Sequence, residues 1–164
     1  MSVRATAQTA DAPALKAAFL YNFAKFTEWP AETLPAGAPL VLCAIDDPEV
    51  ASALEQAASG QRIGEHPVAV WQGRVEGPIG ACHVLYLGRM DTRRTSLLLD
   101  AVKGQPVLTV GVLPAFTKIG GTIRLFVENG RMRFAVNVKS AHRIHLRLSS
   151  EMLKLADIVK DGSE

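Results

Sequence analysis

The fold is seen most clearly in residues 107–159, which read VLTVGVLPAFTKIGGTIRLFVENGRMRFAVNVKSAHRIHLRLSSEMLKLADIV. The run opens with apolar residues of strand length, and Gly120-Gly121 then predict a turn that leads into a hairpin. The turn of that hairpin is Asn129-Gly130, a pair that supplies the two positive φ angles of a type I′ turn. This part of the chain is therefore expected to form the β-rich end of a larger sheet.

Strand-length and helix-length segments alternate along the rest of the chain. Helices are expected at residues 13–27, 48–59, 92–103, 139–145 and from 149 or 150 to 160, and strands at 40–45, 68–71, 82–87, 106–110, 122–128 and 131–138. Strands that are separated by helices predict right-handed crossovers and parallel pairing. The fold class is therefore α/β, with a central mixed, mostly parallel sheet, helices on both faces and a C-terminal β-hairpin. Residues 1–12 are expected to be a disordered tail and residues 13–160 a single domain.

The charges are unevenly distributed. The chain has 164 residues, 21% of them charged, and a net charge of +2. Residues 28–57 carry only acidic charges, whereas residues 118–147 carry seven basic residues and a single acid, Glu128. Such asymmetry fits either a charged partner near the basic region or two ordinary solvated faces. No apolar run reaches the roughly 18 residues that a membrane helix needs, so direct membrane insertion is not expected.

No catalytic or metal-binding motif is visible. The chain lacks a G-x-S-x-G elbow, a phosphate-binding loop and a zincin motif, and Gly111, Gly120 and Gly121 do not form a dinucleotide fingerprint. The two cysteines, Cys43 and Cys82, lack the spacing of a metal site. The sequence therefore predicts neither an enzyme nor a cofactor.

The two cysteines leave two interpretations open. A bridge between Cys43 and Cys82 would close a loop of about 38 residues and would stabilise the fold by about 4 kcal/mol on the chain-entropy model. Alternatively, both are buried free thiols that act as small hydrophobic residues.

The second strand of the hairpin is the best candidate for a binding surface. Arg131, Arg133 and Asn137 alternate with apolar residues and should share one face, which Arg143 could approach from the next helix. Arginine forks suit carboxylates and phosphates. The alternative is a solvated sheet face with cross-strand partners. Nucleic acid is not expected as a ligand, because the patch has no interleaved aromatic residues.

Three blocks of the sequence resemble the YfiR family. They are residues 14–30 (ALKAAFLYNFAKFTEWP), residues 82–87 (CHVLYL) and residues 107–159, above all VLTV, NGRMRF and LKLA. The resemblance implies a protein that is exported to the periplasm of Gram-negative bacteria. It also implies a repressor that binds the periplasmic part of an inner-membrane diguanylate cyclase under redox control. The N-terminus reads like the start of a mature exported protein, so a signal peptide is expected to be absent from this sequence.

The resemblance also bears on individual residues. Cys43 and Cys82 occupy positions that resemble one of the family's cysteine pairs, and a second pair found in some members is missing. Many members have Ser-Asp after VLTV and Phe-Glu-Ile-Asn in the last strand, where this chain has Gly111-Val112 and Phe134–Asn137 (FAVN). The loss of both acids is expected to leave the arginines more exposed.

The sequence thus supports one leading hypothesis and one alternative. The first is a non-enzymatic periplasmic regulator that binds and represses a membrane diguanylate cyclase in c-di-GMP signalling, and a homodimer is a possible form of it. The second is a periplasmic module that binds a small anionic ligand. In either case the partner- or ligand-binding residues are predicted to be Phe116, Gly120, Gly121, Arg131, Arg133, Asn137 and Arg143.

Overall fold

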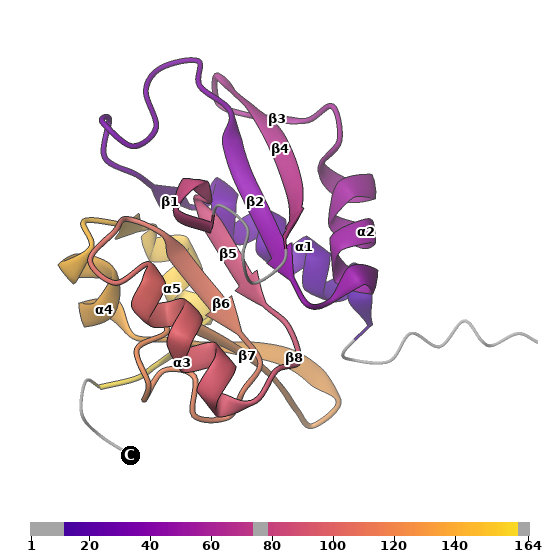
Figure 1. Cartoon of the computed structure of the whole chain (residues 1–164), viewed down its shortest axis with the longest axis vertical. Helices are drawn as coiled ribbons and strands as arrows, with labels where there is room; N and C mark the ends of the chain where they lie inside the picture. Colours follow the sequence, from indigo (N-terminus) through magenta and orange to yellow (C-terminus); the bar gives the residue numbers. More distant parts are fainter. Residues whose placement is uncertain (1–11, 74–78, 161–164) are drawn as a thin grey trace, which may run out of the picture.

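The computed structural model describes residues 12–73 and 79–160, which form a single α/β domain (Figure 1). The predicted disordered tail lies outside the described residues, except for Ala12. The helices are α1 (Pro13–Lys25), α2 (Pro48–Ala58), α3 (Thr92–Ala101), α4 (Val138–Arg143) and α5 (Ser150–Leu155), with a short 3₁₀ turn at Ile79–Ala81. The strands are β1 (Thr27–Glu28), β2 (Leu40–Ile45), β3 (Arg62–Ile63), β4 (His66–Gly73), β5 (Val84–Leu87), β6 (Leu108–Gly111), β7 (Ile123–Glu128), β8 (Arg131–Val136), β9 (Arg147–Leu148) and β10 (Asp157–Ile158).

The central sheet has eight strands in the order β10-β8-β7-β6-β5-β2-β4-β3. Its middle strands are parallel, whereas β3 and the β7–β8 hairpin contribute antiparallel pairs. Asn129 and Gly130 have φ angles of 53° and 74°, which places both in the left-handed region as a type I′ turn requires. The predicted mixed, mostly parallel sheet is therefore confirmed.

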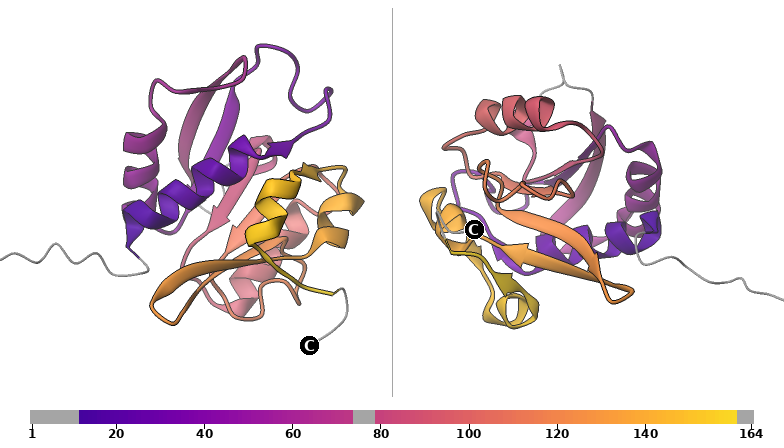
Figure 2. Two further views of the ribbon diagram at one scale, coloured as in Figure 1. Left: turned by 180° about the vertical axis from the view of Figure 1, so that it is seen from behind. Right: turned by 90° about the horizontal axis from the view of Figure 1, so that it is seen from below.

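The sheet separates two hydrophobic cores. Helices α1 and α2 cover one face, while α3 and the segment before β7 cover part of the other (Figures 1 and 2). Successive side chains of β2 alternate between the cores: Leu42 and Ala44 pack on the α1 side, and Cys43 and Ile45 on the α3 side. All six residues of β2 are buried, as the continuous apolar run predicts.

Hydrogen bonds of Asp47 connect the start of α2 to the central strands. The side chain of Asp47 accepts the backbone N–H of Val50 at 3.3 Å and so caps α2, as the Asp-Asp-Pro sequence predicts. The other carboxylate oxygen of Asp47 accepts the hydroxyl of the buried Tyr86 at 2.9 Å. Burial and this carboxylate raise the pKa of Tyr86, so the hydroxyl keeps its proton and holds α2 against β5.

The sequence missed the two-residue strands and placed the ends of the helices too far along the chain. Helix α1 ends at Lys25 rather than residue 27, because Thr27 and Glu28 pair with Leu148 and Arg147 in a separate small sheet. The last helix was expected to reach residue 160 but ends at Leu155. Asp157 and Ile158 instead extend the sheet beside β8. No periodic pattern marks such short strands, because a pairing of two residues depends on distant neighbours.

None of the helices in the described ranges, 12–73 and 79–160, is long and apolar enough to cross a membrane.

Candidate binding surface

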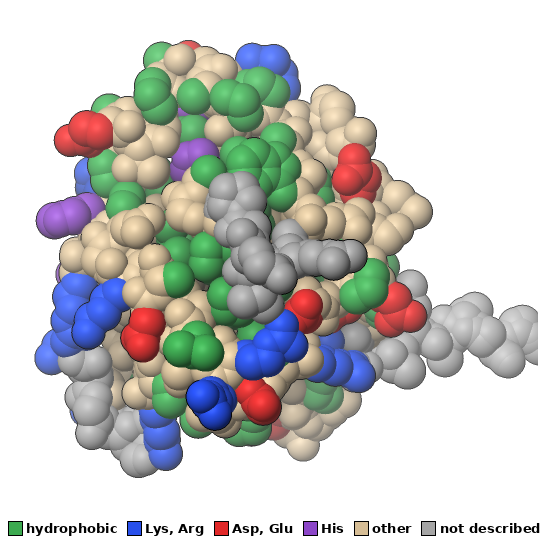
Figure 3. All heavy atoms as spheres, in the orientation of Figure 1, with side chains coloured by type: hydrophobic (Ala, Val, Ile, Leu, Met, Phe, Trp, Pro, Cys, Tyr) green, Lys and Arg blue, Asp and Glu red, His purple; other side chains and the backbone are tan. Residues whose placement is uncertain are grey.

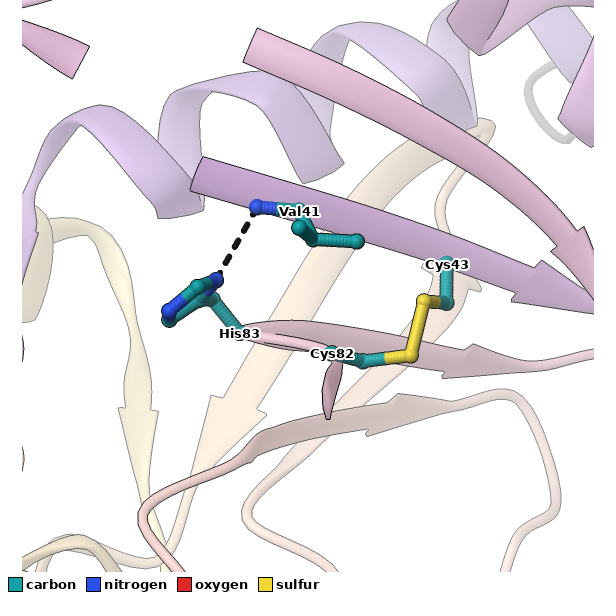
Figure 4. The surroundings of a disulfide bond; sticks show 4 residues. All are labelled: Val41, Cys43, Cys82 and His83. Carbon is teal, nitrogen blue, oxygen red and sulfur yellow. Dashed lines mark hydrogen bonds between the residues drawn. A yellow bond between two sulfur atoms is a disulfide. The ribbon is translucent and has the colours of Figure 1, made fainter. Parts of the chain in front are cut away.

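A disulfide joins Cys43 of β2 to Cys82, which lies just before β5 (Figure 4). The two Cα atoms are 5.9 Å apart, within the usual range for a bridge. Both cysteines are at most 3% exposed and pack in the core on the α3 side. Of the two interpretations that the sequence left open, the bridge is therefore the one that the structure supports.

His83 lies on the opposite side of the strand from Cys82, as the alternation of side chains predicts (Figure 4). Its Nδ1 accepts the backbone N–H of Val41 at 3.0 Å, so the proton must lie on Nε2, which donates to the carbonyl oxygen of Thr33 at 3.2 Å. The ring of Trp29 packs edge-on against His83 with centroids 5.7 Å apart. His83 thus connects strand β2 to the long loop that precedes it.

The environment of His83 favours its neutral form. Burial lowers the pKa of His83 below its ordinary value of 6.5, the hydrogen bond to Thr33 opposes this shift in part, and the charge of His66 adds to it. A protonated ring would also lose the acceptor that Val41 uses.

We expect the stability of the protein to fall as the pH is lowered through about 6.5, because the unfolded chain then binds a proton at His83 that the folded chain resists. His83 has a lower pKa in the folded protein than in the unfolded chain. Its contribution to stability is therefore complete above the unfolded-state pKa and is lost progressively as the pH falls below it. Chemical denaturation at several pH values between about 7 and about 5 measures the effect. His83→Gln, which keeps an acceptor but does not titrate, should flatten this dependence, and an unchanged slope in that variant would contradict the assignment.

Phe116 is fully buried and shapes the segment that leads to the hairpin. Its ring packs against Gly111 of β6 and against Gly121, so closely that a Cβ atom at either glycine would overlap the ring. The structure therefore gives Phe116 and Gly121 a role in packing, with no side-chain surface offered to a partner. It also explains why glycine follows VLTV in this chain, because a larger residue at 111 would need the space that Phe116 occupies.

The β7–β8 hairpin places arginines on the face opposite the α1 core. Arg131 is exposed, and Arg133 is half-buried and forms ion pairs with Glu128 at 3.2 Å and with Asp157 of β10 at 2.6 Å. We call this face, made up of Arg124, Phe126, Glu128, Arg131, Arg133 and Asp157, the hairpin surface. The sequence predicted Arg131 and Arg133 on this face, but it did not predict the pairing of Arg133 with Asp157, because Asp157 was expected to lie in a helix.

Two further members of the hairpin surface were not predicted. The guanidinium of Arg124 lies over the ring of Phe126, 4.4 Å from the centroid, and both side chains are only partly buried. This stacking keeps the arginine extended over an aromatic ring. The signal was present in the sequence as alternation within residues 122–128, since Arg124 and Phe126 fall on the face that Ile123 and Leu125 do not use.

The remaining predicted residues are not among those of the hairpin surface. Asn137 is buried and caps α4 by accepting the backbone N–H of Ser140 at 3.0 Å. Asn137, Gly120 and Arg143 line a cavity of about 530 Å³ between α3, the segment before β7 and α4. Of the predicted residues, Arg131 and Arg133 thus belong to the hairpin surface, and Gly120, Asn137 and Arg143 line this cavity, which we call the α3–α4 cavity.

The α3–α4 cavity has a polar floor and a basic rim. On the floor, the hydroxyl of Thr109 accepts the backbone N–H of Thr122 at 3.0 Å, and the hydroxyls of Thr122 and Ser140 lie 3.3 Å apart. Lys103, Lys118 and Arg143 contribute basic groups to the lining, together with the acid Asp100. This arrangement can accept a small anion, although the polar groups of the floor already bond to one another.

The described part of the chain contains no cluster of three or more His, Cys, Asp and Glu side chains that could hold a metal ion. A comparison of the sequence with known protein families shows that residues 13–157, almost all the described residues, match the family described as YfiR/HmsC-like. The match includes the disulfide, the hairpin surface and the α3–α4 cavity.

Proposed function

Because this chain belongs to the YfiR/HmsC-like family, we propose that it is a non-enzymatic periplasmic regulator. In this proposal it binds the periplasmic part of an inner-membrane diguanylate cyclase and represses it, and so acts on c-di-GMP signalling. The family match over residues 13–157 is the observation that carries the proposal.

The disulfide supports a periplasmic location. A bridge between two buried cysteines persists in oxidising compartments and is rare in the reducing cytosol. Cys43 and Cys82 lie in the core on the α3 side, so the bridge stabilises the sheet and leaves the hairpin surface accessible.

The hairpin surface is the site that we propose for docking. It combines three arginines with an aromatic ring, and arginine and aromatic residues are enriched where proteins bind one another. The ion pairs of Arg133 with Glu128 and Asp157 hold one guanidinium in place before a partner arrives. Arg131 projects at the end of the hairpin, where an acidic group of the partner could reach it. A preorganised surface of this kind loses little side-chain freedom on binding.

We expect Arg131→Glu to weaken binding to the periplasmic region of the cyclase about tenfold, because the charge reversal opposes an acidic partner surface. The measurement is a binding titration with the purified periplasmic region, in oxidised and in reduced protein. Arg62→Glu is the matched control, since Arg62 is also exposed but lies on β3, at the opposite end of the sheet from the hairpin. Equal affinities for both variants and the unmodified protein would exclude the hairpin surface, and no binding at micromolar concentration in either redox state would count against the whole proposal.

The α3–α4 cavity favours a second candidate function, the binding of a small anionic ligand. Its basic rim and buried hydroxyls suit a carboxylate or a phosphate. Screening small carboxylates and inorganic phosphate by thermal shift should find a ligand that raises the melting temperature, and Lys118→Ala should reduce that rise. A melting temperature that no member of the panel shifts at millimolar concentration would contradict this candidate.

A further inference from the structure

The sheet has an open edge along β4. Strand β3 pairs with β4 only through Ile63↔His66 and Arg62↔Pro67, and one more bond joins the N–H of Val68 to the carbonyl of Gln61 at 3.1 Å. Beyond Val68, the other strands that the structure describes leave the outer side of β4 without a partner, up to Gly73. The sheet therefore ends in a stretch of about five residues that can accept another strand.

The direction of the backbone groups on this edge follows from Val68. The N–H of Val68 points outward to Gln61. Successive residues of a strand turn their N–H and C=O groups to opposite edges, so the N–H and C=O groups of Val70 and Gln72 also point outward. Ala69 and Trp71 direct theirs inward to β2, where the register pairs Trp71 with Cys43. The open edge therefore presents two N–H donors and two C=O acceptors.

The composition of β4 does not protect this edge. Residues 68–73 read VAVWQG and contain neither a charged residue nor a proline. Charged residues and prolines are what usually keeps an edge strand from pairing with another chain. On the α3 side of the sheet, Trp71 is 38% exposed. Helix α3 lies over the part of the sheet that holds β6 and β7, well away from β4 (Figure 1). Hydrophobic side chains gather over the upper part of the molecule in Figure 3, where Figure 1 places β2 and β4.

We propose that the β4 edge pairs with the β4 edge of a second copy of this chain, antiparallel, with a two-fold axis at Trp71. In this register Val70 of each copy lies opposite Gln72 of the other, so the outward donors and acceptors of both copies form four hydrogen bonds. The two Trp71 residues meet as a directly opposed pair with Cα atoms about 4.5 Å apart and side chains on the same face. Directly opposed aromatic residues stabilise such pairs.

A second copy fits this edge better than a charged peptide from another protein. The outward groups extend over only two residues, and a two-fold arrangement uses all of them in both copies. The absence of charge on residues 68–73 lets two identical strands meet without repulsion between like charges. Each Trp71 is then covered by its equivalent in the other copy. This inference does not depend on the proposed function.

Sedimentation velocity between about 1 and about 100 µM should show a concentration-dependent dimer. Trp71→Lys should raise its dissociation constant about tenfold or more, because two like charges then lie directly opposite each other. Gln72→Pro should have a similar effect, since it removes an outward N–H and leaves the ladder with β2 intact. Leu97→Lys, on the exposed side of α3, is the matched control and should not change the dimer. Circular dichroism confirms that each variant is folded.

A cysteine variant tests the register. In Trp71→Cys the two thiols would face each other at a Cα separation within the range of a disulfide, so an intermolecular bridge should form readily under mild oxidation. Leu97→Cys, which is 60% exposed, should form such a bridge far more slowly. A monomer at every concentration, a dimer that tolerates both Trp71→Lys and Gln72→Pro, or equal cross-linking of the two cysteine variants would overturn the proposal.

Discussion

Replacing both Cys43 and Cys82 with alanine is expected to lower the free energy of unfolding by about 4 kcal/mol. The bridge closes a loop between residues 39 positions apart, and its loss returns that conformational freedom to the unfolded chain. The loop contains α2, β3 and β4, so the unfolded chain gains conformational freedom mainly in the segment that forms this half of the sheet. Urea denaturation of the oxidised protein and of the double variant measures the difference.

Reduction of the unmodified protein is the control for this prediction, because it breaks the bridge without changing the residues. We expect the reduced protein to unfold at nearly the same urea concentration as the double variant. Mass spectrometry of the folded, unreduced protein should find neither cysteine open to alkylation. Two freely alkylated cysteines, or equal stability with and without reductant, would be incompatible with a stabilising bridge.

Phe116→Ala is expected to lower the free energy of unfolding by about 3–5 kcal/mol, the usual cost of removing a fully buried aromatic ring. The ring fills the space between Gly111 and Gly121, and neither glycine has a side chain that could close the cavity. Thermal and urea denaturation measure the loss. Because the segment before β7 also lines the α3–α4 cavity, the same variant should weaken any anion bound there.

Adding a side chain at Gly121 tests the contact between this glycine and the ring of Phe116. Gly121→Ala places a Cβ atom into the ring of Phe116 and is expected to cost about 1–3 kcal/mol. In Gly121→Ala combined with Phe116→Leu, the smaller side chain relieves the overlap, so the combined loss should be less than the sum of the two separate losses. Gly80→Ala is the matched control, because its nearest neighbour is the flexible end of Gln105. Additive losses would show that Gly121 is not packed on the ring.

Local signals predicted most of the fold correctly. Strand β2 was located to the residue by its unbroken apolar run, and α2 by its Asp-Pro start. The hairpin turn followed from Asn129-Gly130, since few other pairs adopt two positive φ angles without strain. In these segments the local sequence and the final packing favour the same structure.

The candidate site was harder to predict because it depends on neighbours that are distant in sequence. Arg131 and Arg133 were placed on one face by alternation, but the capping role of Asn137 was missed. The strand ends at Val136, and Asn137 turns inward to cap α4. The pairing of Arg133 with Asp157 could not be foreseen either, because it arises only when β10 docks beside β8.

The small sheet of β1 and β9 has a consequence for the order in which the chain can assemble. Thr27 pairs with Leu148, and Phe23 of α1 lies against Phe134 with ring centroids 4.9 Å apart. Part of the apolar stripe of the first helix is therefore covered only by residues from the far end of the chain, whereas α2 packs against the same helix from a neighbouring part of the sequence. Contacts of such long sequence separation slow folding, so we expect the docking of the C-terminal hairpin on the first helix to be a late step.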